Sequence, residues 1–220
     1  MSATTVRPGT ADQIERYTYT ERLCHWITGG AYVYCLATGL AFYTPYLFWI
    51  AVALGGGPTA RFLHPIVGVV FFVAQMWMHV LWHGEAKLTA EDRAWTDHVK
   101  DYVTNHDEAV PAQWKFNAGQ KQYYWAMFYG AFGLLLTGIV MWGPEYDPPG
   151  LFWVRPVVVI LHCIFALLTI GAFIIHIYMS LFTVPGSLHA MISGYVSRDW
   201  ARTHHRLWYE KVTGESRDRS

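Results

Sequence analysis

The chain has 220 residues, of which 53% are hydrophobic and only 15% are charged, and its formal net charge is zero. Soluble domains carry about 25% charged residues, so this composition is not that of a water-soluble domain, and a neutral chain offers no electrostatic reason to bind nucleic acid. The three cysteines form no CxxC or CxxCH motif, which argues against a disulfide framework and against covalently attached haem.

Charged residues are missing from four long stretches of the chain. These stretches are 23–60, 62–84, 122–144 and 156–189. A bilayer core needs about 20 apolar residues per helix, and a helix satisfies its backbone hydrogen bonds internally. The sequence therefore predicts an all-α fold, an integral-membrane four-helix bundle that forms a single domain over residues 1–220. The predicted helices lie near 22–43, 63–84, 122–142 and 157–183.

The segments around the first two helices carry start and stop signals. The first 22 residues are polar and contain no cleavable signal peptide, so we expect the first helix to be an uncleaved anchor. Pro45 and the GGGP motif at 55–58 interrupt the first apolar stretch. Between them, YLFWIAVAL (46–54) is too short to span a bilayer, which predicts an interfacial or re-entrant connector. The motif RFLHPIVG (61–68) is typical of a helix start with Pro65 in the first turn.

The last two helices are joined by GPEYDPPGLFWVR (143–155), which predicts a turn with aromatic residues at the lipid headgroups. Basic residues predict how the helices are oriented. Three lie in the N-terminal segment up to Arg22, five lie in segment 85–121 and six lie in the tail 184–220, against two on the opposite side, Arg61 and Arg155. The positive-inside rule places both termini and segment 85–121 in the cytoplasm.

Histidines are the ionisable residues that recur within the apolar stretches. Six of the eleven lie in or at predicted helices: His25, His64, His79, His83, His162 and His176. The other five are expected at the protein surface or at an interface: His98, His106, His189, His204 and His205. Ionisable residues inside a membrane are costly, and are candidates for function by default.

Two of these histidines lie fourteen residues apart on the fourth predicted helix. Fourteen residues rise about 21 Å and return to within about 40° of the starting direction, so His162 and His176 point to one side at two depths. With both termini inside, His64 matches His162 near the outer face, and either His25 or His79 matches His176 near the inner face. Pairs of neutral imidazoles from facing helices suit noncovalent haem b. The alternative is that each histidine only hydrogen-bonds to a neighbouring helix.

Several short motifs occur in an order that resembles a known family. They are ERLCHW (21–26), RFLHPIVG (61–68), KFNAGQK (115–121), LLTGIVMW (135–142), IHIYMSLF (175–182) and GSLHAMISGYVSRDWARTHHRLWYEK (186–211). Together they resemble the gamma subunit of membrane-bound respiratory formate dehydrogenase, a four-helix di-haem cytochrome b. The resemblance runs from about residue 16 to residue 211, which is nearly the whole chain.

The resemblance implies two noncovalent b haems with four axial ligands. His25, in the CHW motif, and His176 would hold the inner haem, and His64 and His162 would hold the outer haem. His79 is not part of the family pattern.

The resemblance also implies the partners. A molybdenum- or tungsten-containing alpha subunit oxidises formate, and an iron–sulfur beta subunit carries electrons to the outer haem. The inner haem then reduces menaquinone or ubiquinone. The chain would be the membrane electron-transfer subunit of a formate:quinone oxidoreductase, within a heterotrimer that can form a higher oligomer. An equivalent subunit of a hydrogenase or another molybdenum oxidoreductase is an alternative, and a haem-free transporter or structural membrane subunit is a second one.

The resemblance places the quinone at KFNAGQK, directly before the third helix. Asn117, Gly119 and Gln120 would line the site beside His176. Side-chain amides can donate hydrogen bonds to a quinone oxygen, and glycine lets the backbone approach closely. Asn117 followed by Gln120 three residues later also fits a capping box at a helix start.

Overall fold

The structure is a computed structural model that describes residues 12–104, 106, 109–143 and 153–215. It divides into two compact units. The bundle unit comprises Leu23–Val80 and Ala126–Phe173, and the tail unit comprises Met1–Arg22, Leu81–Trp125 and Ile174–Ser220. A single domain over residues 1–220 stays a prediction.

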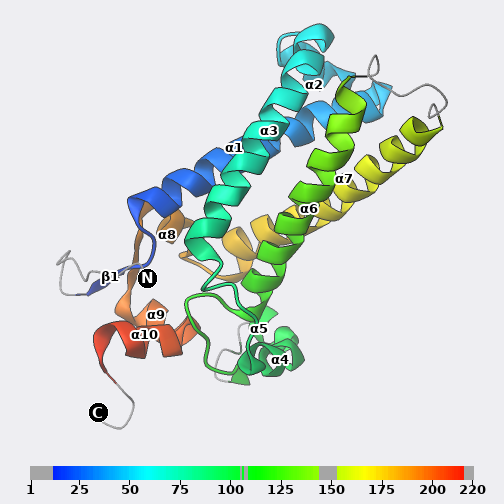
Figure 1. The fold of residues 1–220 in the computed structure, drawn as a ribbon. Coiled ribbons are helices and arrows are strands. Elements are labelled where there is room, and N and C mark those ends of the chain that lie inside the picture. Colours follow the sequence, from blue (N-terminus) through cyan, green and yellow to red (C-terminus); the bar gives the residue numbers. More distant parts are fainter. Residues whose placement is uncertain (1–11, 105, 107–108, 144–152, 216–220) are drawn as a thin grey trace. The chain divides into compact units, whose positions relative to one another are not determined.

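Four long helices dominate the chain (Figure 1). They are α1 (Tyr19–Tyr43), α3 (Gly57–Trp82), α6 (Ala118–Trp142) and α7 (Val154–Tyr178), and a short π-helical segment, η4 (Met179–Thr183), continues α7. The predicted all-α fold with four long helices is confirmed. Each helix begins a few residues earlier than predicted, most of all α3, which begins at Gly57 rather than near residue 63.

Three segments are long and apolar enough to cross a membrane by length and composition: Gly57–Trp82, Ala118–Trp142 and Val154–Thr183. The remaining long helix, α1, has 25 residues and is about 37 Å long, which exceeds the bilayer core of about 30 Å. Threonines, glycines and tyrosines lower its hydropathy below that of the other three. A membrane crossing by α1 stays a prediction.

The prediction that Pro65 lies in the first turn of its helix was wrong. Pro65 lies inside α3, eight residues after its first residue, Gly57. The physical reason is that Gly57 and Pro58 already supply a helix start, since proline suits the first turn. Pro65 has no N–H group and removes one helical hydrogen bond next to His64, a loss that neighbouring helices accommodate in membrane proteins.

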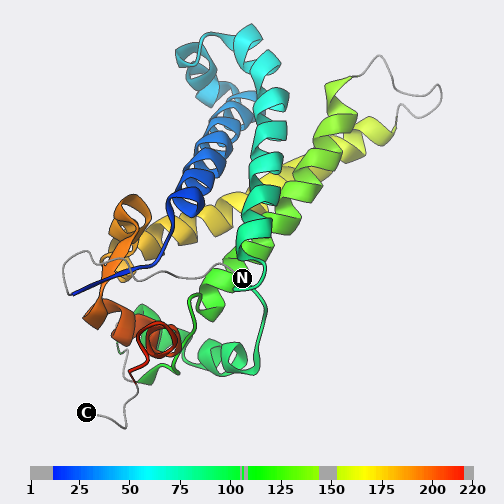
Figure 2. The same cartoon turned by 60° about the vertical axis from the view of Figure 1, so that its left-hand side comes forward.

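Segment 46–54 forms a connector rather than a span, as predicted. It folds into η1 (Pro45–Leu47) and the six-residue α2 (Phe48–Ala53), which join α1 to α3 at one end of the bundle unit (Figure 1, Figure 2). Ala51 packs with Ala41 and Ala60, while Trp49 remains 65% exposed.

Aromatic side chains join the helices within the bundle unit. Tyr32 of α1 packs against Phe71 of α3 and Phe173 of α7, with ring centroids 5.4 and 5.1 Å apart. Phe72 of α3 meets Phe132 of α6 edge to face at 5.0 Å. These contacts hold the four helices in one bundle.

Short elements build the tail unit. Strands β1 (Gln13–Glu15) and β2 (Tyr195–Ser197) pair antiparallel, with Ile14 opposite Val196. The short helices are α4 (Ala90–Asp97), α5 (Val99–Val103), α8 (Ser187–Ser193), α9 (Arg198–His204) and α10 (Arg206–Thr213). Their core contains Trp95, Tyr102, Ala118 and Val184. Most of the predicted turn at 143–155 lies outside the described residues.

The expectation that His205 lies at the surface was wrong. His205 is 1% exposed. Its Nδ1 lies 2.6 Å from the Trp114 carbonyl oxygen, and its Nε2 lies 2.9 Å from Nη2 of Arg16. A carbonyl only accepts and a guanidinium only donates, so the ring is neutral with its proton on Nδ1. Burial, and then the charge of Arg16, lower the pKa of His205 well below its ordinary value. His98 and His204 are half-buried, while His106 and His189 are exposed.

Candidate functional site

Two of the predicted ligands face each other within the bundle unit. His64 projects from α3 and His162 from α7, and their ring centroids lie 6.5 Å apart with an interplanar angle of 61°. The sequence matched these residues by depth alone, and the structure brings them together.

This separation fits two imidazoles bound to opposite sides of one metal ion. A metal–imidazole nitrogen bond is about 2.0 Å, and that nitrogen lies about 1.1 Å from the ring centre, so two rings in line are about 6.2 Å apart. Two protein ligands suffice for haem iron, because the porphyrin supplies the other four nitrogens. The observed 6.5 Å therefore leaves room for one iron atom between the rings.

Each of the two rings is held by a threonine hydroxyl from the neighbouring helix. Thr38 Oγ1, on α1, lies 2.7 Å from Nδ1 of His64. Thr137 Oγ1, on α6, lies 2.8 Å from Nδ1 of His162. Both threonines are buried, at 0% and 7% exposure.

These hydrogen bonds define the tautomer of both rings. The Thr38 hydroxyl donates to the Tyr34 carbonyl at 2.8 Å, and the Thr137 hydroxyl donates to the Gly133 carbonyl at 2.6 Å. A hydroxyl has one proton, so each can only accept from its histidine. Nδ1 therefore carries the proton, and the Nε2 lone pair is available to a metal.

Glycines keep the surroundings of both rings open. A β-carbon added at Gly39 would lie 3.6 Å from Cε1 of His64, and one added at Gly138 would lie 3.6 Å from Cε1 of His162. A β-carbon at Gly68, one turn beyond His64 on α3, would meet nothing within 4 Å. The ligand set, its tautomers and this space fit a haem.

The three histidines considered for the inner pair divide between the two units. His79 stacks on Phe128 at 4.4 Å within the bundle unit, and Phe128 in turn packs on Phe132. His25 packs edge to face on Trp26 at 5.3 Å, also in the bundle unit. His176 belongs to the tail unit. The pairing of His25 with His176 stays a prediction.

The predicted quinone residues form the first turn of α6. The Gln120 N–H donates to Asn117 Oδ1 at 2.9 Å, and the Asn117 N–H donates to Gln120 Oε1 at 3.1 Å. This reciprocal pair is a capping box, the structural role that the sequence also allowed. Asn117 Nδ2 donates to the Tyr102 hydroxyl at 3.0 Å, and Asn117 is 2% exposed.

Gly119 lies close to Trp95, whereas Gln120 is partly exposed. A β-carbon at Gly119 would lie 3.1 Å from Cη2 of Trp95, so a side chain there would require a shift of a few tenths of an ångström between the two residues. Gln120 is partly exposed, and its capping bond uses only Oε1. The Gln120 Nε2 group takes no part in the capping box, whereas Asn117 caps the helix through Oδ1 and donates to Tyr102 through Nδ2.

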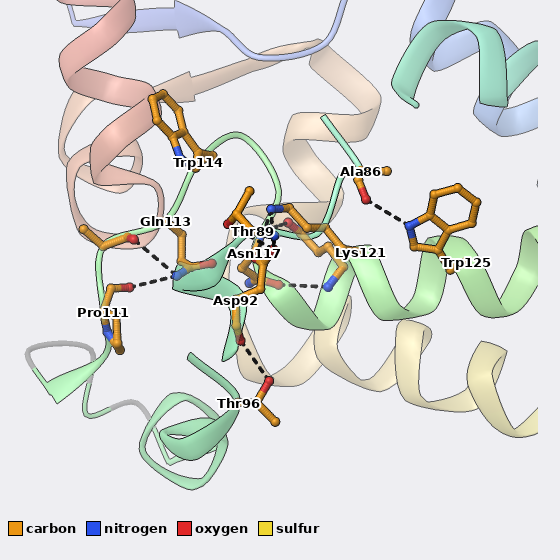
Figure 3. A network of polar contacts seen from close by, with 12 residues as sticks. Ala86, Thr89, Asp92, Thr96, Pro111, Gln113, Trp114, Asn117, Lys121 and Trp125 are labelled. Carbon is orange, nitrogen blue, oxygen red and sulfur yellow. Dashed lines mark hydrogen bonds and ion pairs between the residues drawn. The ribbon is translucent and has the colours of Figure 1, made fainter. Parts of the chain in front are cut away.

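A buried ion pair next to this turn was not predicted. Lys121 reaches from α6 to Asp92 of α4, with Nζ 2.9 and 2.8 Å from the two carboxylate oxygens (Figure 3). The two side chains are 2% and 7% exposed. Asp92 also accepts from the Thr89 N–H at 2.6 Å. The Thr-x-x-Asp spacing at 89–92 is the sequence signal for this helix cap.

Comparisons with known proteins identify the family of this chain. The family described as prokaryotic cytochrome b561 matches residues 16–194. The formate dehydrogenase cytochrome b556(fdo) subunit of Escherichia coli K12 is 34% identical over 201 residues, which cover 91% of this chain and 94% of that protein. The nitrate-inducible cytochrome b556(Fdn) subunit of the same strain is 32% identical over 199 residues, covering 90% and 91%.

A relative from another organism has the same description. The formate dehydrogenase cytochrome b556 subunit of Haemophilus influenzae Rd is 30% identical over 199 residues, covering 90% of this chain and 83% of that protein. The family match, over residues 16–194, spans all four long helices. The chain belongs to the prokaryotic cytochrome b561 family, as a membrane-embedded cytochrome b similar to the cytochrome b556 subunits of formate dehydrogenases.

Proposed function

We propose that this chain is a di-haem cytochrome b subunit that passes electrons from the iron–sulfur subunit of a formate dehydrogenase across the membrane to quinone. The single observation that carries the proposal is the His64–His162 pair, with its 6.5 Å separation and its two Nδ1–H groups held by threonine hydroxyls. The names of the relatives support the identity of the complex.

Four histidines have assigned roles in this proposal. His64 and His162 would hold the outer haem, and His25 and His176 would hold the inner haem, and each bound haem would supply one-electron chemistry. The protein holds neutral imidazoles in fixed orientations, and the apolar helices around them keep water away from the rings. A molybdenum- or tungsten-containing alpha subunit would oxidise formate, so this chain itself breaks no bond of formate.

The quinone is proposed to bind at the first turn of α6, beside His176. Gln120 donates from its partly exposed amide to a quinone oxygen, and Asn117 holds the turn through its capping box. Gly119 keeps the backbone close to Trp95. Menaquinone and ubiquinone both present the carbonyl oxygens that such a donor recognises.

The distribution of basic residues supports the direction of transfer. Three basic residues in the N-terminal segment up to Arg22, five in segment 85–121 and six in the tail favour a cytoplasmic location for both termini and for the start of α6. Electrons that enter at the opposite face and protons taken up at the cytoplasmic face would separate charge. One electron moved across the whole membrane corresponds to about 2.3 kcal/mol per 100 mV.

Haem counting tests the proposal. We expect the pyridine haemochrome spectrum of the purified chain to give two noncovalent b haems. His64→Ala and His162→Ala should each lose one haem, and the same one. His79→Ala, which removes a histidine stacked on Phe128, is the matched control and should keep both. Retention of both haems in the His64 and His162 variants would refute the outer pair.

The inner pair is tested with the same assay. His25→Ala and His176→Ala should each lose the haem that the His64 variant keeps. Loss of that haem in His79→Ala, together with its retention in His25→Ala, would assign His79 in place of His25. A chain that folds without any haem would refute the cytochrome assignment.

A further inference from the structure

The two threonine–histidine contacts repeat one motif in the two halves of the bundle unit. Thr38 is followed by Gly39 on α1 and lies 26 residues before His64, and Thr137 is followed by Gly138 on α6 and lies 25 residues before His162. Both histidines follow a leucine, at LH 63–64 and 161–162. A helical hairpin with Thr-Gly on its first helix and Leu-His on its second thus occurs twice.

The two hairpins also agree in their interatomic distances. The Thr–Nδ1 distances are 2.7 and 2.8 Å, and the distance from a glycine β-carbon to Cε1 is 3.6 Å in both hairpins. Each threonine also donates to the carbonyl four residues earlier. Two equivalent arrangements built from different stretches of sequence are hard to explain by helix packing alone.

We propose that Thr38 and Thr137 are a matched pair of positioning residues that set the tautomer, the ring orientation and the basicity of the two outer-haem ligands. The inference rests on the proposed function, because it takes His64 and His162 as ligands. It adds two residues that act on the metal through those histidines.

The chemistry follows from the direction of the hydrogen bond. A histidine that donates its second N–H becomes a more basic ligand, and removal of such a partner typically costs 10–100-fold in metal affinity. A more basic imidazole stabilises ferric iron more than ferrous iron, because the ferric ion carries the higher positive charge. Loss of either hydroxyl should therefore raise the reduction potential of the outer haem.

Ring orientation is the second property that the threonines control. The two imidazole planes are 61° apart, and each ring is anchored at Nδ1 to a helix other than its own. Ligand planes far from parallel give a low-spin ferric haem a strongly anisotropic EPR signal. A ring without its anchor can rotate about the metal–nitrogen axis, so the signal should change when the hydroxyl is lost.

The experiment compares isosteric variants of the whole chain in its membrane complex. Thr38→Val and Thr137→Val remove the hydroxyl and keep the branched shape, while Thr38→Ser and Thr137→Ser keep the hydroxyl. Thr28→Val is the matched control. Thr28 is also buried in α1 and also donates to the carbonyl four residues earlier, at 2.8 Å, and lies ten residues before Thr38.

Potentiometric titration and EPR provide the readouts. If each hydroxyl favours the ferric state about tenfold, its loss raises the outer-haem potential by about 59 mV for a one-electron couple. The outer haem is identified as the one absent from His64→Ala. The valine variants should show the shift and an altered EPR signal, and the serine variants and Thr28→Val should match the wild type at this haem.

Each outcome decides the inference. Valine variants with the wild-type potential and EPR signal at the outer haem would overturn it, even when the histidine variants confirm the ligands. Loss of only the outer haem in the valine variants would support it, because the remaining haem shows that the chain folds. If the valine variants lose both haems, the serine variants provide the test, because they keep the hydroxyl. Serine variants that lose both haems as well would overturn the inference. Retention of both haems in His64→Ala would instead refute the proposed function.

Discussion

Tyr123 stacks face to face on His176, with ring centroids 4.4 Å apart and ring planes within 7° of parallel. The two residues come from α6 and α7, within the tail unit. A stacked aromatic pair is worth about 0.5–1.5 kcal/mol beyond its buried area, so Tyr123 restricts the orientation of the His176 ring. His176 thus has a stacked neighbour where His64 and His162 have threonines.

Replacement of Tyr123 should affect the inner haem alone. Tyr123→Leu removes the stacking ring, and we expect a lower inner-haem content or a changed EPR signal for that haem. Tyr123→Phe is the control, because it keeps the ring and should behave as wild type. Haem counting and EPR on the purified chain measure both effects. A leucine variant with two haems and unchanged signals would show that the stack has no influence on ligation.

The ion pair between Lys121 and Asp92 should be costly to break. Both side chains are buried, so Lys121→Met leaves an uncompensated carboxylate and should destabilise the tail unit by about 3–5 kcal/mol. The double variant Lys121→Met/Asp92→Asn removes that charge and should recover part of the loss. Thermal unfolding followed by tryptophan fluorescence provides the comparison.

An exposed pair on α10 supplies the control for this experiment. Arg206 and Glu210 lie four residues apart, with Nε and Oε1 at 2.9 Å, and both side chains are partly exposed. Glu210→Gln should cost about 0.3–0.5 kcal/mol. Equal stability of Lys121→Met and Glu210→Gln would contradict the structural role assigned to the buried pair.

Acidification should weaken the tail unit through His205. Its pKa in the folded protein is lowered well below the ordinary 6.5, first by burial and then by Arg16. The contribution of the neutral ring is fully present above the unfolded pKa and is lost as the pH falls toward the folded pKa. Because the unfolded chain then binds one more proton, stability should fall by up to about 1.36 kcal/mol per pH unit below about pH 6.5.

The unfolding free energy of His205→Gln should depend less on pH in this range. His189→Gln, at an exposed position, is the control and should keep the wild-type dependence. The Glu21 carboxyl titrates at lower pH than a histidine in the unfolded chain. Burial raises the pKa of Glu21, but the charge of Lys115 and the hydrogen bonds from Lys115, Thr18 and Trp82 lower it by more. The pKa of Glu21 is therefore below its ordinary value of 4.5. An unchanged slope in His205→Gln between about pH 6.5 and pH 5 would contradict the assignment.

The sequence predicted that His64 and His162 lie close together because its signals are local and strong. A histidine in a long uncharged stretch stands out, and the positions of the helices with their predicted orientation match His64 to His162 by depth. Their threonine partners carry no comparable signal, because threonine is neutral and its contact lies on another helix. The repeated Thr-Gly, 26 and 25 residues before the two histidines, is the pattern that would have revealed them.

The burial of His205 was beyond local reasoning. Its position in a polar tail favoured exposure, yet its partner Arg16 lies 189 residues earlier in the chain. The pairing of β1 with β2 brings the N-terminal segment to the tail. The early start of α3 has a simpler reason. The sequence offers two prolines, Pro58 and Pro65, that could each stand in the first turn of this helix. The prediction chose Pro65, whereas the helix begins at Gly57 with Pro58 in its first turn.

Glycine positions in the bundle unit allow a last prediction. A β-carbon at Gly133 would lie 2.6 Å from the Phe165 ring, and one at Gly130 would lie 2.4 Å from Cγ2 of Thr169. Both glycines let α6 approach α7 closely, as small residues do between membrane helices. Gly133→Ala should therefore destabilise the bundle unit by about 1–3 kcal/mol through overpacking.

Gly171→Ala is the matched control on the facing helix. A β-carbon there would meet nothing within 4 Å, and nine residues beyond His162 place it on the opposite side of α7 from that ligand. Alanine is the better helix former by about 0.5–1 kcal/mol, so this variant should be at least as stable as wild type and should keep its haems. Thermal unfolding of the purified chain compares the unfolding temperatures of the two variants and the wild type. If Gly133→Ala unfolds at or above the temperature of Gly171→Ala, close contact between α6 and α7 at Gly133 is not what stabilises the bundle.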